Sequence, residues 1–181
     1  MEAIHPFPRL ARLTLEKHLA GRPVDDSLLK EIEAPADLWR PRRACFVSIK
    51  TLGGGLRGCV GTVFPVQGDL AREIMANAIS AATRDPRFPP LRPREMGEVS
   101  FSVDVLSPPE PVDSPAELNP ACWGVIVSRG EQRGLLLPDL EGVETVDQQL
   151  AIAARKAGLS SLKGVSLQRF SVDRYREDGP A

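Results

Sequence analysis

The sequence has few cysteines and no long apolar run. Its 181 residues include three cysteines, Cys45, Cys59 and Cys122, which are too few and too scattered for a disulfide framework or a zinc site built from paired cysteines. A reducing compartment fits this usage best. No apolar run approaches the length of a membrane span, and the first residues lack the apolar stretch of a signal peptide. These absences predict a cytoplasmic protein with no membrane segment.

The sequence also lacks an excess of charge of either sign. Lys and Arg number 23 and Asp and Glu number 24, so the net charge is -1. Binding to nucleic acid normally relies on a surplus of basic residues that neutralise phosphates, so this balance argues against it. The length suits one domain, or one domain with a small annex.

Familiar catalytic and cofactor motifs are missing as well. The glycines at 53–55 lack the Gly-Lys-Ser/Thr ending of a phosphate-binding loop and do not open a helix. The two histidines, His5 and His18, are both near the N-terminus, so a Cys–His dyad would require that segment to fold over the hairpin predicted from the strands at 44–51 and 56–63. No spacing typical of metal ligands is present. We therefore predict no metal and no cofactor.

The pattern of apolar residues predicts helices and strands in nearly equal measure. Helices are expected over 8–19, 27–32, 69–83 and 145–156, and strands over 44–51, 56–63, 99–105, 122–127, 134–138 and 165–175, the last with a bulge near 168–169. A proline-rich connection after residue 107 suggests a smaller subdomain within about 107–145.

The most informative stretch is the strand that follows the three glycines, 56–62. Side chains alternate along a strand, which places Arg57, Cys59 and Gly61 on one face. A fixed positive charge beside a thiol favours the thiolate, the reactive form. Gly58 and Gly61 weaken a strand and mark either a bulge or a close approach of a ligand or another backbone. The alternative is structural: Cys59 is then a small buried apolar residue, and the glycines relieve packing.

A second segment, 85–91, follows the alanine-rich helix. Its prolines restrict the backbone on both sides of Phe88 and hold the segment extended. Asp85 and Arg87 can bind each other, cap the helix or contact a ligand, while Phe88 anchors the loop. A structural clamp and a binding loop are both consistent with these residues.

Together the two segments, LRGCVGT at 56–62 and DPRFPPL at 85–91, resemble the signature of the AMMECR family, named for the Alport syndrome, midface hypoplasia and elliptocytosis chromosomal region. Further similarity runs from about residue 8 to residue 176. The resemblance implies one AMMECR-type domain over 1–181. Its fold would be α+β, with an antiparallel sheet and flanking helices in a larger subdomain and a smaller α/β annex.

The resemblance supplies no proven reaction, but it implies partners. Prokaryotic members resemble component A of the AmmeMemoRadiSam system, whose other components are a Memo-like protein and a radical SAM protein. A partner of either type is therefore expected.

Two hypotheses follow, and whether the protein is an enzyme stays open between them. The first is a small-molecule or thiol-chemistry site in which Cys59 and Arg57 are catalytic. Its ligand-binding residues would be Gly58, Gly61, Thr62, Asp85, Arg87 and Phe88. The second is a non-catalytic module that binds a partner protein through the 85–91 loop and the hairpin.

Overall fold

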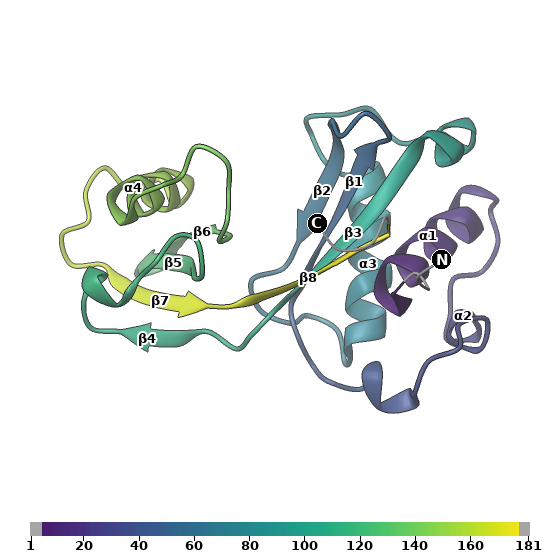
Figure 1. Ribbon diagram of the computed structural model, residues 1–181, viewed down its shortest axis with the longest axis horizontal. Helices are drawn as coiled ribbons and strands as arrows, with labels where there is room; N and C mark the ends of the chain where they lie inside the picture. Colours follow the sequence, from purple (N-terminus) through teal and green to yellow (C-terminus); the bar gives the residue numbers. More distant parts are fainter. Residues whose placement is uncertain (1–4, 178–181) are drawn as a thin grey trace. The chain divides into compact units, whose positions relative to one another are not determined.

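The structure is a computed structural model that describes residues 5–177. The chain divides into two units. Unit 1 contains the residues up to Val105 and those from Asp173 onward, and unit 2 is Leu106–Val172. Strand β3 begins in unit 1 and ends at Leu106, while β8 begins at Val172 and continues into unit 1 (Figure 1).

The elements follow one another along the chain in this order: α1 (Pro6–Leu19), α2 (Ser27–Lys30), β1 (Cys45–Thr51), β2 (Leu56–Gly61), α3 (Leu70–Thr83), β3 (Val99–Leu106), β4 (Glu110–Val112), β5 (Gly124–Arg129), β6 (Gln132–Leu136), α4 (Val146–Lys156), β7 (Ser166–Phe170) and β8 (Val172–Arg176). Short 3-10 helices occupy Ala36–Leu38, Pro93–Glu98 and Pro115–Glu117.

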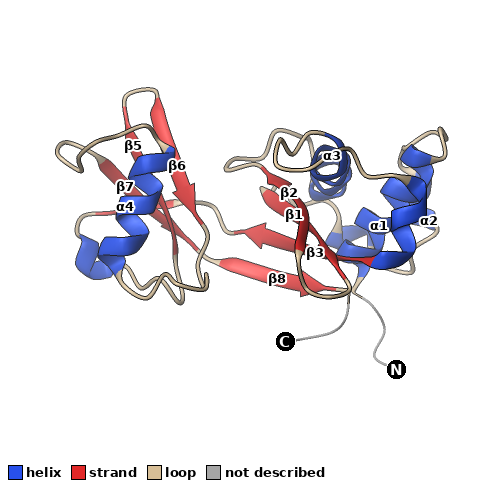
Figure 2. Cartoon of the chain, turned by 90° about the horizontal axis from the view of Figure 1, so that it is seen from above, coloured by secondary structure: helices blue, strands red, loops and turns tan. Residues whose placement is uncertain are grey.

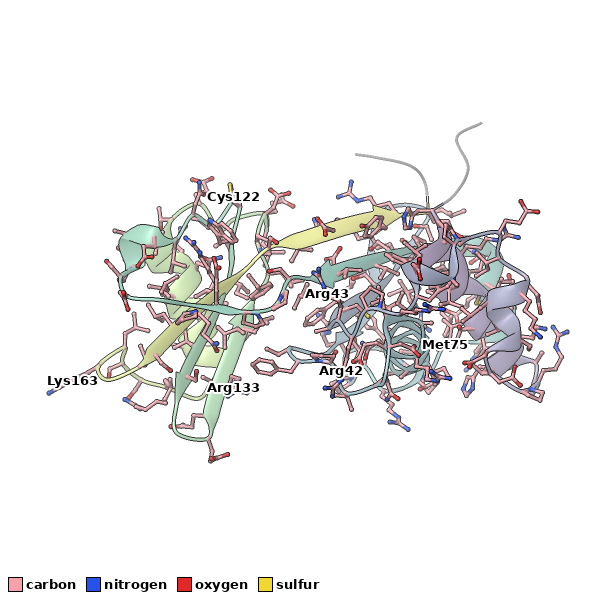
Figure 3. The ribbon with its side chains drawn as sticks, turned by 90° about the horizontal axis from the view of Figure 1, so that it is seen from below. Arg42, Arg43, Met75, Cys122, Arg133 and Lys163 are labelled. Atoms are coloured by element: carbon pink, nitrogen blue, oxygen red, sulfur yellow. The ribbon has the colours of Figure 1, made fainter. Side chains whose placement is uncertain are left out.

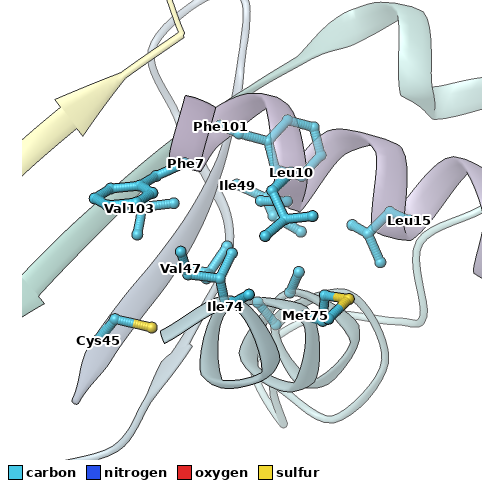
Figure 4. Packing of buried hydrophobic residues seen from close by; sticks show 14 of the residues in the cluster. Phe7, Leu10, Leu15, Cys45, Val47, Ile49, Ile74, Met75, Phe101 and Val103 are labelled. Carbon is cyan, nitrogen blue, oxygen red and sulfur yellow. The ribbon is translucent and has the colours of Figure 1, made fainter. Parts of the chain in front are cut away.

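Unit 1 is built on a four-stranded sheet with the order β2-β1-β3-β8. Strand β1 pairs antiparallel with both β2 and β3. Its alternate residues Cys45, Val47 and Ile49 are fully buried, as expected for a strand with one face against a core. Helices α1 and α3 supply the other side of that core (Figures 2 and 4).

Helix α3 shows why this region folds as it does. The Asp69 side chain accepts a hydrogen bond from the Arg72 backbone N–H and so caps the helix N-terminus. Ile74 and Ala78, one turn apart, are fully buried, and Ile74 lies against Val47 of β1 (Figure 4). Leu10 of α1 fills the same cluster. An amphipathic helix thus covers the sheet that contains the 56–62 segment.

Unit 2 is a second four-stranded sheet, with the order β4-β7-β5-β6 and helix α4 packed on β5 and β6 (Figure 2). Thr145 and Gln148 form a reciprocal capping box at the start of α4. Gly158, with φ of 70°, follows the end of the helix. The core of this unit includes Val125, Leu150 and Ala153.

Most expected elements are present, and the α+β class with antiparallel sheets and flanking helices is confirmed. The second hairpin has a shorter turn than expected. The strands predicted over 122–127 and 134–138 are β5 and β6, which run closer together in sequence because Gly130, with φ of 59°, forms a tight turn between Arg129 and Gln132. A smaller subdomain is expected within about 107–145, and the compact unit 2 spans Leu106–Val172.

The expectation of one bulged strand over 165–175 is wrong. The chain leaves one sheet at Phe170 and enters the other at Val172. Between them, Ser171 exchanges hydrogen bonds with Ser107: its backbone N–H donates to Ser107 Oγ at 2.9 Å and its carbonyl accepts from Ser107 N–H at 3.0 Å. The change of apolar phase therefore marks a change of sheet.

None of the helices within residues 5–177 is both long enough and apolar enough to cross a membrane.

Candidate functional site

Residues Leu56–Gly61 of the 56–62 segment form β2, which lies at the edge of its sheet. Ile49 of β1 lies opposite Gly58, and the next residue, Lys50, lies opposite Leu56. The pairing therefore skips Arg57, which is the extra residue of a β-bulge. Bulges re-aim the side chain of the extra residue, so strict alternation does not hold at this point of the strand.

Arg57 is directed to a carboxylate and not to the thiol. Its Nε lies 2.8 Å from Glu95 Oε1, its Nη2 lies 3.3 Å from Glu95 Oε2, and its Nη1 donates to the Pro89 carbonyl at 3.0 Å. The hydrogen bond from Arg57 holds the pKa of Glu95 below its usual value. The prediction that Arg57 is the charge partner of Cys59 is wrong, because the bulge turns the guanidinium away.

Cys59 is half-buried, and its thiol contacts a serine. Ser48, the residue opposite it on β1, donates a hydrogen bond from Oγ to Cys59 Sγ at 3.1 Å. Burial raises the pKa of the Cys59 thiol, and the Ser48 hydrogen bond and the Arg87 charge only oppose that rise. The thiolate is therefore not stabilised as predicted, because the loss of hydration on burial outweighs the Ser48 hydrogen bond and the Arg87 charge.

Asp85 and Arg87 bind the open edge of β2 at the backbone of Cys59. Asp85 Oδ2 accepts from the Cys59 N–H at 2.9 Å, and Arg87 Nη2 donates to the Cys59 carbonyl at 3.4 Å. The two side chains bind each other through Arg87 Nη2 and Asp85 Oδ2 at 2.7 Å and through Nε and Oδ1 at 2.9 Å. The pair thus satisfies edge groups that a further strand would otherwise bind.

The two partners of this ion pair differ in exposure. The Asp85 side chain is 3% exposed, whereas that of Arg87 is 54% exposed. The hydrogen bond from Arg87 is the main reason that the pKa of Asp85 lies far below its usual range. Asp85 is therefore a buried anchor, and Arg87 presents one side of its guanidinium to solvent.

Phe88 lies within reach of two guanidinium groups. Its ring centroid is 5.6 Å from Arg87 Cζ and 6.0 Å from Arg57 Cζ, close enough for cation–π attraction. Two backbone hydrogen bonds fix the loop: the Phe88 N–H donates to the Asp85 carbonyl and the Leu91 N–H to the Ala82 carbonyl. The loop is therefore held both at its ends and by its side chains.

The space beside the two glycines of the segment is filled by protein atoms. A Cβ added at Gly58 would lie 2.3 Å from the Ala81 carbonyl oxygen of α3. At Gly61 it would lie 2.3 Å from the Phe46 ring and 2.6 Å from the Cys45 carbonyl oxygen. Both glycines are thus required by close packing within unit 1.

Thr62 binds a buried carboxylate that the sequence reasoning missed. Its Oγ1 donates to Glu73 Oε1 at 2.5 Å. Glu73, 1% exposed on α3, also accepts from the backbone N–H groups of Val66 and Gln67. The sequence did carry a signal for Glu73, because an acidic residue on the apolar face of helix α3 is unusual and needs a partner. Glu73 fixes the turn after β2.

Two other contributors were missed for different reasons. Ser48 could have been found from strand pairing, because it lies opposite Cys59. Glu95 is 38 residues from Arg57 in sequence and gives no local signal. Within residues 5–177, no group of three or more His, Cys, Asp or Glu side chains is arranged to hold a metal ion.

This arrangement suits recognition of a ligand or partner through hydrogen bonds, the charge of Arg87 and the ring of Phe88. The thiol is protonated near neutral pH, because its pKa is raised above an already basic value. Both arginines are bound to carboxylates, and Arg87 and Phe88 sit on a braced loop. These features define an α+β domain with a rigid, partly cationic loop on a sheet edge.

Comparison with known protein families matches residues 8–178 to the AMMECR1 family. The chain belongs to this family. The match spans both units, and it includes β2 and the 85–91 loop.

Relatives support the same assignment. A protein of Thermotoga maritima is 45% identical over 174 residues, which cover 95% of this chain and 98% of that protein. A protein of Clostridium acetobutylicum is 43% identical over 173 residues, which cover 95% of this chain and 36% of that protein. The crystal structure of uncharacterized protein PH0010 from Pyrococcus horikoshii has a TM-score of 0.83 at 29% identity, covering 96% of this chain and 92% of that one.

Proposed function

We propose that this chain is a protein-binding module and that the loop 85–91 on the edge of β2 is its binding surface. The observation that supports this best is the fixed exposure of Arg87, whose guanidinium is held by Asp85 yet is 54% exposed. Arginine and aromatic residues on rigid supports are the side chains that contribute most to binding between proteins. Arg87 and Phe88 provide both.

Thiol chemistry at Cys59 has less support. Its pKa is raised by burial, and its hydrogen-bond partner is the Ser48 hydroxyl, which is no general base. The glycines that flank Cys59 are in contact with protein atoms. A substrate would therefore have to bind beside a protonated thiol with no base to activate it.

The partner we propose is the Memo-like protein or the radical SAM protein that the family resemblance implies. The Clostridium relative is consistent with a module that works beside another protein part, because the matched segment is only 36% of that longer chain. Domains joined in one chain in one organism often act together as separate chains in another. The proposed ligand is thus a folded protein.

The test is co-purification of this chain, tagged, with a co-expressed Memo-like or radical SAM protein from the same genome. Arg87→Ala and Phe88→Ala should reduce the captured partner at least tenfold, while Cys59→Ser should leave it unchanged. Arg94→Ala is the matched control, because Arg94 is an exposed arginine in the following segment. Thermal unfolding of each variant checks that it is folded.

Two results would contradict the proposal. One is a complex that forms equally well with Arg87→Ala, Phe88→Ala and the unchanged protein. The other is loss of the complex in Cys59→Ser alone, which would return attention to the thiol.

A further inference from the structure

The guanidinium of Arg87 has a nitrogen that the protein itself does not bind. Arg87 donates from Nε and Nη2 to Asp85, and Nη2 also donates to the Cys59 carbonyl. Among residues 5–177, no acceptor lies within hydrogen-bond distance of Arg87 Nη1. Each terminal nitrogen of a guanidinium carries two N–H groups. The ion pair with Asp85 therefore orients Arg87 and leaves the two N–H groups of Nη1 for an acceptor from outside this part of the chain.

Two further arginines lie at the ends of the same loop. The Leu91 N–H donates to the Ala82 carbonyl at 2.8 Å, which brings the two ends of the loop together. Arg84 and Arg92, one near each end, are both exposed. Neither forms an ion pair with another residue of 5–177. One closed loop thus carries an open donor at Arg87 and two unpaired arginines at its base.

The charge of this region is positive, counted with Arg57 of β2. Four arginines and two carboxylates belong to it: Arg57, Arg84, Arg87, Arg92, Asp85 and Glu95. Both carboxylates are already bound, each by one of these arginines. The adjoining stretches 58–66 and 74–83 contain Glu73's helix only beyond its last turns and carry no charged residue. The region therefore has an excess of two positive charges in a chain of net charge -1.

The rest of the following 3-10 helix does not change this excess. Arg94 and Glu98, the other charged residues of Pro93–Glu98 besides Glu95, add one charge of each sign. A surface with an excess of one sign attracts a partner of the opposite sign and disfavours partners of the same sign. The charge therefore selects an anionic partner.

The ring of Phe88 lies beside the open donor. Its centroid is 5.6 Å from Arg87 Cζ, and the side chain is half-buried. The exposed Pro89 and Pro90 follow it and stiffen the backbone. A ligand that uses both features has a negatively charged acceptor for Arg87 and an apolar group for Phe88, close to each other. Two residues of one peptide segment, one acidic and one apolar, provide this pair.

We propose that this surface recognises an acidic segment of the partner protein, in which an Asp or Glu lies close in sequence to a large apolar residue. The inference rests on the proposed function, because it names the chemistry of what the loop 85–91 binds. The carboxylate would accept from Arg87 Nη1 and the apolar side chain would pack on Phe88. Further acidic residues would face Arg84 and Arg92. A nucleic acid is the less favoured anion, because the chain as a whole has no basic surplus.

The test is a titration of the ¹⁵N-labelled full chain, followed by NMR, with three capped eight-residue peptides of glycine and serine. The first contains three glutamates and one leucine. The second has glutamines in place of the glutamates, and the third has alanine in place of the leucine. The first should shift the signals of 84–92 and of the Arg87 Nε–H, more weakly at 300 mM than at 50 mM salt. The glutamine peptide should bind at least tenfold more weakly and the alanine peptide about threefold more weakly.

Variants locate the contacts. Arg87→Gln should weaken the first peptide at least tenfold, and Arg84→Gln and Arg92→Gln about threefold each. The last two lie outside the Asp85 ion pair, so they keep the test valid if Arg87→Gln is unstable. Arg155→Gln is the matched control, because Arg155 is an exposed arginine of α4 without an ion pair to residues 5–177, and it should have no effect. In Phe88→Ala the leucine and alanine peptides should bind equally.

Several results would overturn the inference. Equal binding of the glutamate and glutamine peptides is one, and equal losses in Arg84→Gln, Arg92→Gln and Arg155→Gln, which would mean general charge attraction, are another. A preference for leucine that persists in Phe88→Ala would place the apolar contact elsewhere. A ten-nucleotide single-stranded DNA that shifts the same signals at lower concentration than the glutamate peptide would assign the surface to nucleic acid.

This titration and the co-purification fail separately. If the glutamate peptide binds as expected and no complex is captured, the identity of the partner is wrong and the preference for an acidic segment stands. If a complex forms and depends on Arg87 while the glutamate and glutamine peptides do not differ, the proposed function stands and this inference is wrong.

Discussion

The two units each place a glycine of an edge strand against a helix. In unit 1, Gly58 of β2 faces α3, where an added Cβ would lie 2.3 Å from the Ala81 carbonyl oxygen. In unit 2, Gly134 of β6 faces α4, where an added Cβ would lie 2.0 Å from the Ala153 carbonyl oxygen. Both strands lie at the edge of their sheets. The same packing device thus occurs twice in one chain.

What differs is the way the two edge strands are held from outside. A buried carboxylate and its arginine bind the Cys59 backbone on β2. On β6, the Gln132 side chain donates from Nε2 to the Gly158 carbonyl at 3.3 Å. The glycine in the 56–62 segment is therefore explained by packing that unit 2 shares, whereas the charged loop is particular to unit 1. Specific function is better sought in the loop than in the glycine.

The largest change in the free energy of unfolding should come from the glycines that pack against helix backbone in both units. Gly58→Ala and Gly134→Ala each force a Cβ into a helix backbone, and each should lower the free energy of unfolding by about 3 kcal/mol, since overpacking against backbone cannot relax easily. Calorimetry and hydrogen exchange would show which unit is weakened.

Gly68→Ala is the control for these two variants, because nothing lies within 4 Å of an added Cβ at that glycine. If Gly58→Ala left the free energy of unfolding unchanged while Gly134→Ala lowered it, the two glycines would not have the same packing role. A ligand beside Gly58 would then become the better explanation for that glycine.

The next effect should separate the two edges. Asp85→Asn removes the charge that binds Arg87 and should lower the free energy of unfolding at pH 7 by about 2 kcal/mol, as expected for hydrogen bonds to a charged group. Urea unfolding measures this. Hydrogen exchange should place the loss in β2 and leave β6 protected.

The same carboxylate predicts a dependence on acid. Its pKa is lower in the folded chain than the usual value near 4, so its contribution is full above about pH 4 and is lost as pH falls below that value. Stability should therefore fall from pH 5 to pH 2 less steeply in Asp85→Asn than in the unchanged protein. Identical slopes would show that Asp85 is not held as an anion.

A smaller effect concerns the thiol on β2. Burial raises the pKa of Cys59, and it raises that of Cys45 to about 12, so both should react slowly. At pH 8 the exposed Cys122 (Figure 3) should be alkylated about tenfold faster than Cys59, with Cys45 protected until unfolding. Mass spectrometry of timed samples gives the three rates. If Cys59 reacted fastest, thiol chemistry would become the better hypothesis.

The smallest effect should come from the β6 edge. Gln132→Ala removes one exposed hydrogen bond and should change the free energy of unfolding by less than about 0.5 kcal/mol. Urea unfolding beside Asp85→Asn provides the comparison. A loss as large as that of Asp85→Asn would mean that the two edges are held equally firmly.

The local elements follow from short-range signals in the sequence. The cap at Asp69, the capping box at Thr145 and the alternation of buried residues on β1 act between near neighbours, so their signals are local. The sequence also predicted that the segments 56–62 and 85–91 lie together, and Asp85 and Arg87 do bind the Cys59 backbone. The glycine turn of the first hairpin was readable for the same reason, whereas the strands of the second hairpin extend further into the expected turn.

The direction of the charged side chains, by contrast, depends on how the elements pack together. A bulge of one residue turned Arg57 from Cys59 to Glu95, and a sheet change at Ser171 divided what looked like one strand. The pKa of Cys59 rose because burial by distant parts of the chain outweighed the charge near it. Registers, burial and ion pairs between remote residues depend on how elements pack, and no local pattern encodes that.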